Sequence, residues 1–135
     1  MNAVDTNVLI YAHDPRDPEK QNKAVSLIAS LTDGGLLWQV ACEYVAASRK
    51  LAAFGLDTQK AFDDLKRLRG VWATVPPTWA VLDTAERLMV TGNLSYWDAM
   101  VVAACMENGI QTLYTEDFDS STTALTGVMI INPFI

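Results

Sequence analysis

Four carboxylates are spaced along the chain at points where expected strands end or expected helices begin: Asp5, Glu43, Asp98 and Asp117. Carboxylates that lie close together repel one another, and the pKa of each would rise unless a cation neutralised them. Hard oxygen ligands around a small cavity suit Mg²⁺ or Mn²⁺. Such an ion can turn water into a nucleophile and stabilise the charge of an in-line attack on phosphate. The residues therefore predict a site for Mg²⁺ (or Mn²⁺), provided that the fold brings them together.

Each acid also has a purely structural explanation when it is taken alone. Ser95 and Asp98 have the spacing of a capping box, and an acid in the first turn of a helix is favoured by the helix dipole. Glu43 alone would be a helix-start acid, and Asp117 alone belongs to a polar loop. Asp5 differs from the others, because an acid within an apolar start of the chain must find partners when it is buried.

The elements that must position these acids alternate along the chain. Apolar runs predict strands up to Asp5 and over 36–38, 71–75, 112–115 and 128–131. Helical spacing predicts helices from about Thr6, over 16–32, 40–53 and 58–70, from the capping Thr78, and from Ser95 to Gly109. Alternating strands and helices predict an α/β fold of three α/β/α layers around a short, mainly parallel central sheet. Ligands bind beyond the carboxyl ends of the strands in such sheets. No linker or repeat divides the chain, so we expect a single domain over 1–135.

The spacing of apolar residues in these strands and helices also predicts which side chains face the core and which could contact a ligand. Trp97 is set apart, because it neighbours Asp98 and could stack RNA bases. The lone His13 lacks the partners that a zinc or hydrolase site would need. Both cysteines are expected to be reduced core residues of a cytoplasmic protein. The expected core positions discussed below are Cys42, Cys105, Phe62, Trp38, Trp72 and Trp79.

The net charge of the chain argues against a nucleic-acid partner, but the distribution of the charges does not. The chain has 135 residues, half of them apolar, and a formal net charge of -6, whereas affinity for phosphate normally comes from Lys and Arg. Residues 49–69, however, hold six basic against three acidic side chains, while residues 88–135 hold no Lys or Arg. This basic stretch could bind RNA or be a solvated helix face. The candidate RNA-binding residues are Arg49, Lys50, Lys66, Arg67 and Arg69.

The apolar runs are too short for a membrane span. The longest wholly apolar run covers eight residues, 99–106, and a span needs about 20. We therefore expect no membrane association.

Three segments resemble the signature motifs of PIN-domain nucleases. Residues 4–11 (VDTNVLIY) resemble the opening motif, 95–99 (SYWDA) the segment with the third acid, and 113–118 (LYTEDF) with 131–134 (INPF) the closing motif. Glu43, within 39–44 (QVACEY), occupies the place of the second acid. The resemblance covers essentially the whole chain in the right order. The compact length is most similar to the toxin ribonucleases of VapBC-type toxin–antitoxin pairs.

The resemblance implies a PIN-like fold and a metal-dependent endoribonuclease, the toxin of a type II pair, that hydrolyses RNA by metal-activated water. It implies Mg²⁺ (or Mn²⁺) bound by the catalytic acids Asp5, Glu43, Asp98 and Asp117. The resemblance also implies four supporting residues. Thr6 and Asn7 would shape the site, Thr115 would support it, and Asp119 would be a fifth carboxylate. The implied partners are RNA, a second copy of the chain and an antitoxin whose tail occupies the active-site groove, with DNA reached only through the antitoxin.

One segment departs from the family pattern. Family members often place a small polar residue shortly before the helix of the second acid, whereas Trp38 and Gln39 stand there in this chain. We expect this departure to affect substrate fit more than metal binding.

Two other classes of function remain open from the sequence. An aspartyl-phosphate phosphatase could use Asp5 as nucleophile, but it wants a second acid two residues on, and Asn7 cannot serve as that acid. An interaction protein with a catalytically silent PIN fold would act through complex formation alone.

Overall fold

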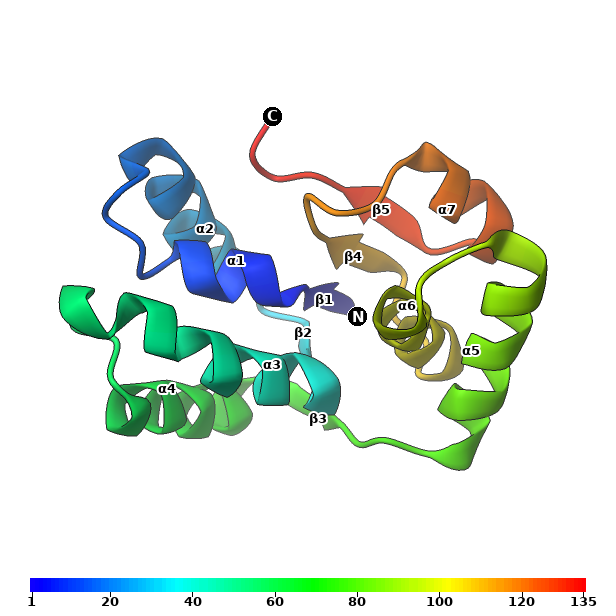
Figure 1. Ribbon diagram of the computed structural model, residues 1–135, viewed down its shortest axis with the longest axis horizontal. Helices are drawn as coiled ribbons and strands as arrows, with labels where there is room; N and C mark the ends of the chain where they lie inside the picture. The colour runs from blue at the N-terminus through cyan, green and yellow to red at the C-terminus, as the bar shows by residue number, and fades with distance from the viewer.

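Five short strands form one parallel sheet in the computed structural model, which describes residues 1–135 (Figure 1). The strands are β1 (Asn2–Val4), β2 (Gly34–Leu37), β3 (Ala73–Val75), β4 (Thr112–Tyr114) and β5 (Met129–Ile131). Their order is β3-β2-β1-β4-β5, and every neighbouring pair is parallel. The expected α/β fold is confirmed, with a sheet that is wholly rather than mainly parallel. The strand order reverses between β1 and β4, and ligands of open α/β sheets bind at such a reversal.

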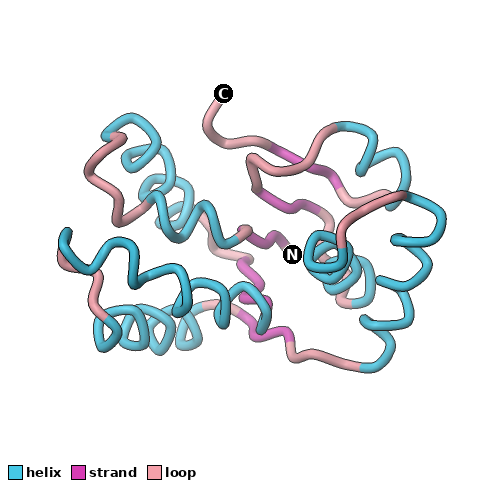
Figure 2. Tube along the Cα trace, in the orientation of Figure 1, coloured by secondary structure: helices cyan, strands magenta, loops and turns pink.

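Helices cover the sheet on two sides, with α1 to α4 on one side and α5 and α6 on the other (Figures 1 and 2). In chain order they are α1 (Thr6–Tyr11), α2 (Pro18–Ser30), α3 (Trp38–Ser48), the 3-10 helix η1 (Arg49–Phe54), α4 (Thr58–Val71), α5 (Trp79–Gly92), α6 (Tyr96–Glu107) and α7 (Ser120–Thr126). Thr78 and Ser95 cap α5 and α6 as expected. None of the helices combines the length and apolar character that crossing a bilayer requires.

One helix prediction was wrong in part, and one helix was missed. The helix expected over 40–53 is divided, because α3 ends at Ser48 and a 3-10 turn follows it. The helix α7 was not expected, since its first four residues are Ser and Thr, which favour caps and turns over helix interiors. Asp119 caps α7 by accepting a hydrogen bond from the backbone N–H of Ser121 at 2.9 Å.

The core is one cluster of 26 buried apolar residues, and it excludes several side chains that the periodicity placed inside. Trp72 and Cys105 are buried as expected, whereas Cys42 is exposed. Phe62 is 46% exposed and Trp79 is 81% exposed. The buried face of α5 consists instead of Val81, Thr84, Ala85 and Leu88. Trp38 begins α3 rather than continuing β2, and it is 57% exposed.

A buried carboxylate joins three of the helices. Asp64 on α4 accepts hydrogen bonds from the Tyr44 hydroxyl of α3 at 3.0 Å and from Arg67 Nη2 at 2.8 Å. His13, just beyond α1, places Nε2 at 3.0 Å from the same carboxylate. Lys60 Nζ lies at 3.3 Å. The charge of Arg67 is therefore engaged within the protein.

Gly34 generates a prediction about packing. A Cβ at Gly34 would lie 2.5 Å from the ring of Trp72, and that ring is held by a hydrogen bond from Nε1 to the Leu31 carbonyl at 3.2 Å. We expect Gly34→Ala to lower the free energy of unfolding by about 1–3 kcal/mol, the usual cost of overpacking. Urea unfolding followed by circular dichroism measures it.

Gly70→Ala is the matched control, because a Cβ at this position of α4 meets nothing within 4 Å. We expect this variant to be as stable as the wild type or up to about 1 kcal/mol more stable. Equal urea midpoints for Gly34→Ala and the wild type would contradict the packing argument.

Candidate active site

The four candidate acids come from four different segments around the carboxyl ends of the central strands. Asp5 follows β1 and is the N-cap of α1, and Asp117 lies in the loop after β4. Asp98 lies in the first turn of α6, as expected. Glu43 lies in the second turn of α3 rather than the first, because α3 begins already at Trp38.

Asp5 is the buried member of the set, with 6% of its surface exposed. Its Oδ1 accepts a hydrogen bond from the Thr6 N–H at 2.7 Å, and its Oδ2 accepts one from the Thr115 hydroxyl at 2.9 Å. The pKa of Asp5 is raised to about 6, chiefly by burial and to a smaller extent by the negative charges of Asp117 and Glu43, against the lowering effect of the two hydrogen bonds. Three carboxylates thus share one electrostatic environment.

Asn7 holds Asp117 beside this centre. Asn7 Nδ2 donates to Asp117 Oδ2 at 3.0 Å and to the Thr115 hydroxyl oxygen at 3.2 Å. The Asp117 N–H donates to the same hydroxyl oxygen at 3.1 Å. Asn7 Oδ1 is buried and has no hydrogen-bond partner. The supporting residues Thr6, Asn7 and Thr115 therefore all contact candidate acids.

Glu43 is connected to the beginning of α6 through Gln39. The Thr6 hydroxyl donates to Glu43 Oε2 at 3.1 Å, and Gln39 Nε2 lies 2.5 Å from Glu43 Oε1. The same Gln39 amide donates to the Trp97 carbonyl at 3.1 Å. The adjacent Asp98 carboxylate is partly buried and accepts no hydrogen bond from the protein. The sequence marked Gln39 only as a departure from the family pattern and not as a partner of Glu43, although its spacing of four residues from Glu43 places both on one helix face.

A second set of contacts that the sequence did not predict holds the loop that carries Asp117. The Tyr11 hydroxyl donates to Glu116 Oε1 at 2.7 Å, and Lys20 Nζ donates to Glu116 Oε2 at 2.9 Å. Lys20 Nζ also lies 4.6 Å from the ring centroid of Tyr11 and 5.5 Å from that of Phe134. These contacts join α1, α2 and the C-terminal residues to the loop, and no local sequence pattern marks them.

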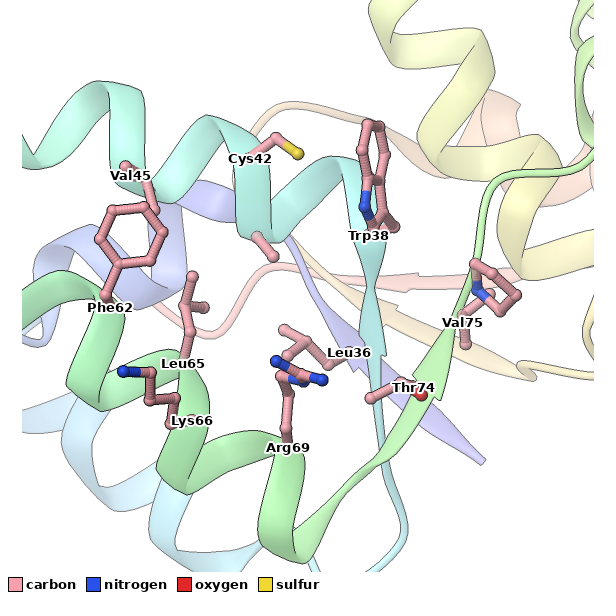
Figure 3. Close-up of a pocket in the computed structure, with 12 residues that line it drawn as sticks. Leu36, Trp38, Cys42, Val45, Phe62, Leu65, Lys66, Arg69, Thr74 and Val75 are labelled. Carbon is pink, nitrogen blue, oxygen red and sulfur yellow. The ribbon is translucent and has the colours of Figure 1, made fainter.

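Asp119 and the basic candidates contact none of the four acids. Asp119 caps α7, and the hydrogen bond from the Ser121 side chain lowers its pKa. Arg49 and Lys50 lie exposed on η1. Lys66 and Arg69 line a hollow of about 660 Å³ between α3, α4 and β3, where most of the lining is apolar (Figure 3). We call this space the basic hollow.

The donor chemistry of the site fits a hard divalent cation. The carboxylates near Asp5 and the unpartnered Asn7 Oδ1 are oxygen donors of the kind that Mg²⁺ and Mn²⁺ take. In their present conformations, no three acidic, His or Cys side chains form a group that could hold a metal ion. The acids would have to converge on the ion.

The buried charge of Asp5 generates a prediction about pH. The pKa of Asp5 in the folded state, about 6, lies above the ordinary value of 3.8, so the folded state holds the Asp5 proton more tightly than the unfolded state does. The stability that comes from this proton is fully present below about pH 4 and is lost as the pH rises through 6. In the presence of a chelator we expect Asp5→Asn to gain about 1–3 kcal/mol of unfolding free energy over the wild type at about pH 8. The gain should vanish at about pH 4. Urea unfolding at both pH values measures it.

The control variant is Asp83→Asn, because Asp83 is an exposed acid on α5. Its difference from the wild type should stay constant between the two pH values. A pH-independent difference for Asp5→Asn would show that Asp5 is not a strained buried charge.

Comparisons with known proteins agree with this fold. One similar solved structure is a toxin–antitoxin complex from Klebsiella pneumoniae, with a TM-score of 0.70 and 15% identity over 98% of each chain. A second is FitAB bound to an IR36 DNA fragment, with a TM-score of 0.74 and 17% identity over 100% of this chain and 96% of that one. A third is the sarcin-ricin loop cleaving toxin VapC20 from Mycobacterium tuberculosis, with a TM-score of 0.69 and 21% identity over 93% of this chain and 95% of that one. At these identities the likeness shows the fold. No curated protein sequence matches the chain significantly.

The family model of the PIN domain matches residues 3–124, from β1 into α7, and so includes all four candidate acids. The predicted resemblance to the PIN-domain family is confirmed. This chain belongs to the PIN domain family.

Proposed function

We propose that this protein is a metal-dependent endoribonuclease and the toxin of a type II toxin–antitoxin pair, with residues 1–135 acting as one domain in the cytoplasm. The observation that carries the proposal is the buried, high-pKa Asp5 beside Asp117 and Glu43 at the strand reversal of a PIN fold. A hydrolytic role also agrees with the description of VapC20, a structural neighbour, as a toxin that cleaves the sarcin-ricin loop.

The residues that would hold Mg²⁺ (or Mn²⁺) are Asp5, Glu43, Asp98 and Asp117. A divalent ion supplies Lewis acidity, lowers the pKa of water and neutralises charge on the phosphate that is attacked. The Thr6 N–H and the Thr115 hydroxyl orient Asp5, while Asn7 orients Asp117. The Thr6 hydroxyl and Gln39 orient Glu43. Charge neutralisation at Asp5 also favours its ionised form at neutral pH.

The phosphatase alternative is less well supported by the residue two positions after Asp5. Asn7, which stands where that class needs a second acid, is engaged with Asp117.

The proposed partners are RNA, an antitoxin and a second copy of the chain. Two structural neighbours are a toxin–antitoxin complex and FitAB bound to DNA, which supports an antitoxin partner through which DNA would be contacted. A toxin of this kind is normally held inactive by that partner.

Removing single charges from the acidic site tests the activity. We expect Asp5→Asn and Asp98→Asn each to reduce RNA cleavage by more than about 100-fold, because loss of a direct ligand should exceed the 10- to 100-fold effect of outer-shell changes. Asp83→Asn should cleave like the wild type. Cleavage of total RNA, followed by sequencing of the RNA ends, measures all three. Full activity of both site variants would refute the proposal.

Metal removal tests the cofactor separately. We expect EDTA to abolish cleavage, and Mg²⁺ or Mn²⁺ to restore it. The same ions should raise the melting temperature of the wild type but not of Asp5→Asn, because an ion that binds only the folded state stabilises that state. A wild-type protein that binds its antitoxin but cleaves no RNA with either ion would support a catalytically silent interaction protein.

A further inference from the structure

A second hollow lies beside the acidic site and is lined by exposed aromatic side chains. It has a volume of about 250 Å³ and lies between the start of α3, the residues after β3, and α5 and α6. Trp38 and Trp97 are 57% and 63% exposed, and Tyr96 is also exposed. We call this space the aromatic hollow. Its volume lies below the 300–1,000 Å³ typical of sites for drug-sized ligands, so it suits a single ring system.

We propose, on the basis of the ribonuclease function proposed above, that the aromatic hollow takes one unstacked base of a single-stranded RNA. The base would stack on Trp97 and Trp38, and the chain would then lead its phosphates to the acids. Stacking on aromatic side chains is how proteins hold bases that are not paired in a helix.

The aromatic hollow adjoins two of the acids through Gln39 and Trp97. Gln39 lines the hollow, and its amide contacts both Glu43 and the Trp97 carbonyl. Trp97 is followed directly by Asp98. A base held in the hollow would therefore lie next to two of the four acids.

Trp97 is also restrained in a way that suits stacking. Its ring and that of Tyr96 meet edge to face, with centroids 4.8 Å apart and an interplanar angle of 68°. Such contacts stabilise an aromatic pair. Because the indole is held by its neighbour and still largely exposed, it can accept a base with little loss of side-chain freedom.

The aromatic hollow adjoins the basic hollow. Trp38, Val75 and Pro76 line both spaces, and Figure 3 shows Trp38 at the side of the basic hollow across from Lys66 and Arg69. Neither of these two cations forms an ion pair in the protein. A groove that combines unpaired basic side chains with aromatic rings is typical of proteins that bind single-stranded nucleic acid.

The observations favour RNA over a protein as the occupant of this groove. An apolar patch can also bind a protein. Here, however, exposed aromatic rings lie between residues that adjoin two acids and two cations without ion pairs, as a strand of alternating bases and phosphates would require. A protein contact is therefore an outcome that the experiment must be able to detect.

The test measures RNA binding in the Asp98→Asn background with Mg²⁺ present. The probe is a labelled single-stranded RNA of about 12 nucleotides with random sequence, a length within the site sizes of single-strand binders. We expect Trp97→Ala to weaken binding by about 5- to 150-fold, the effect of losing one stacked base. Trp97→Phe should retain most of the affinity. A duplex RNA of the same length should show no such dependence on Trp97.

Trp79→Ala is the matched control, because Trp79 is 81% exposed but does not line the hollow. We expect it to bind the probe like the background protein. In the double variant Lys66→Gln, Arg69→Gln, the slope of log affinity against log salt concentration should fall by about 1.4, as two lost phosphate contacts predict for a single strand.

Three results would overturn the inference: equal affinity of Trp97→Ala and its background, an equal loss for single-stranded and duplex RNA, or a change in self-association without a change in RNA affinity. These results are distinct from failure of the proposed function. If the wild type cleaves RNA while Trp97→Ala binds normally, only the inference fails. If binding depends on Trp97 while the wild type cleaves nothing with either ion, only the proposed activity fails.

Discussion

The carboxylate of Asp5 is the constraint on which the site depends, because it is buried directly beyond the central strand of a parallel sheet. β1 has hydrogen-bonded neighbours on both sides, β2 and β4, so the residue that follows it cannot turn to solvent. Two short hydrogen bonds satisfy its oxygens but do not offset the cost of burial, and the pKa rises to about 6. Strongly shifted pKa values of this kind cluster at functional sites.

The remaining acids are arranged around this fixed charge by polar side chains from separate elements. Asn7 reaches Asp117 across the strand reversal, and Gln39 connects Glu43 of α3 with the start of α6. Glu116, held by Tyr11 and Lys20, anchors the loop after β4. The acids therefore differ in freedom, since Asp5 is fixed by burial while the Asp98 carboxylate has no partner in the protein. Such a set can converge on an ion without refolding of the elements that carry it.

Local signals were sufficient to predict the five strands and most of the helices, and to place Asp5, Asp98 and Asp117 on them. Thr78 and Ser95 cap the helices that follow them, and the alternation of strands and helices implied the parallel sheet. Tertiary contacts could not be predicted in this way: Gln39 meets Trp97 across 58 residues, and Arg67 is engaged by a buried Asp64. The sum of charges over 49–69 does not distinguish basic side chains that form ion pairs within the protein from those that do not. α7 was missed because a short run of Ser and Thr carries no apolar period.

Three of the four errors in the predicted core have a common cause. Trp38, Cys42 and Phe62 were placed inside because they continue apolar patterns, and all three line the basic hollow instead. Periodicity reports which face of a helix is apolar, but it does not report whether that face meets the core or a groove. Burying an indole would yield more stability than exposing it, so packing alone does not account for Trp38 and Trp97 at the surface. Their position beside the acids gives that exposure a chemical reason, because a strand of bases offers the flat apolar surface that would cover them.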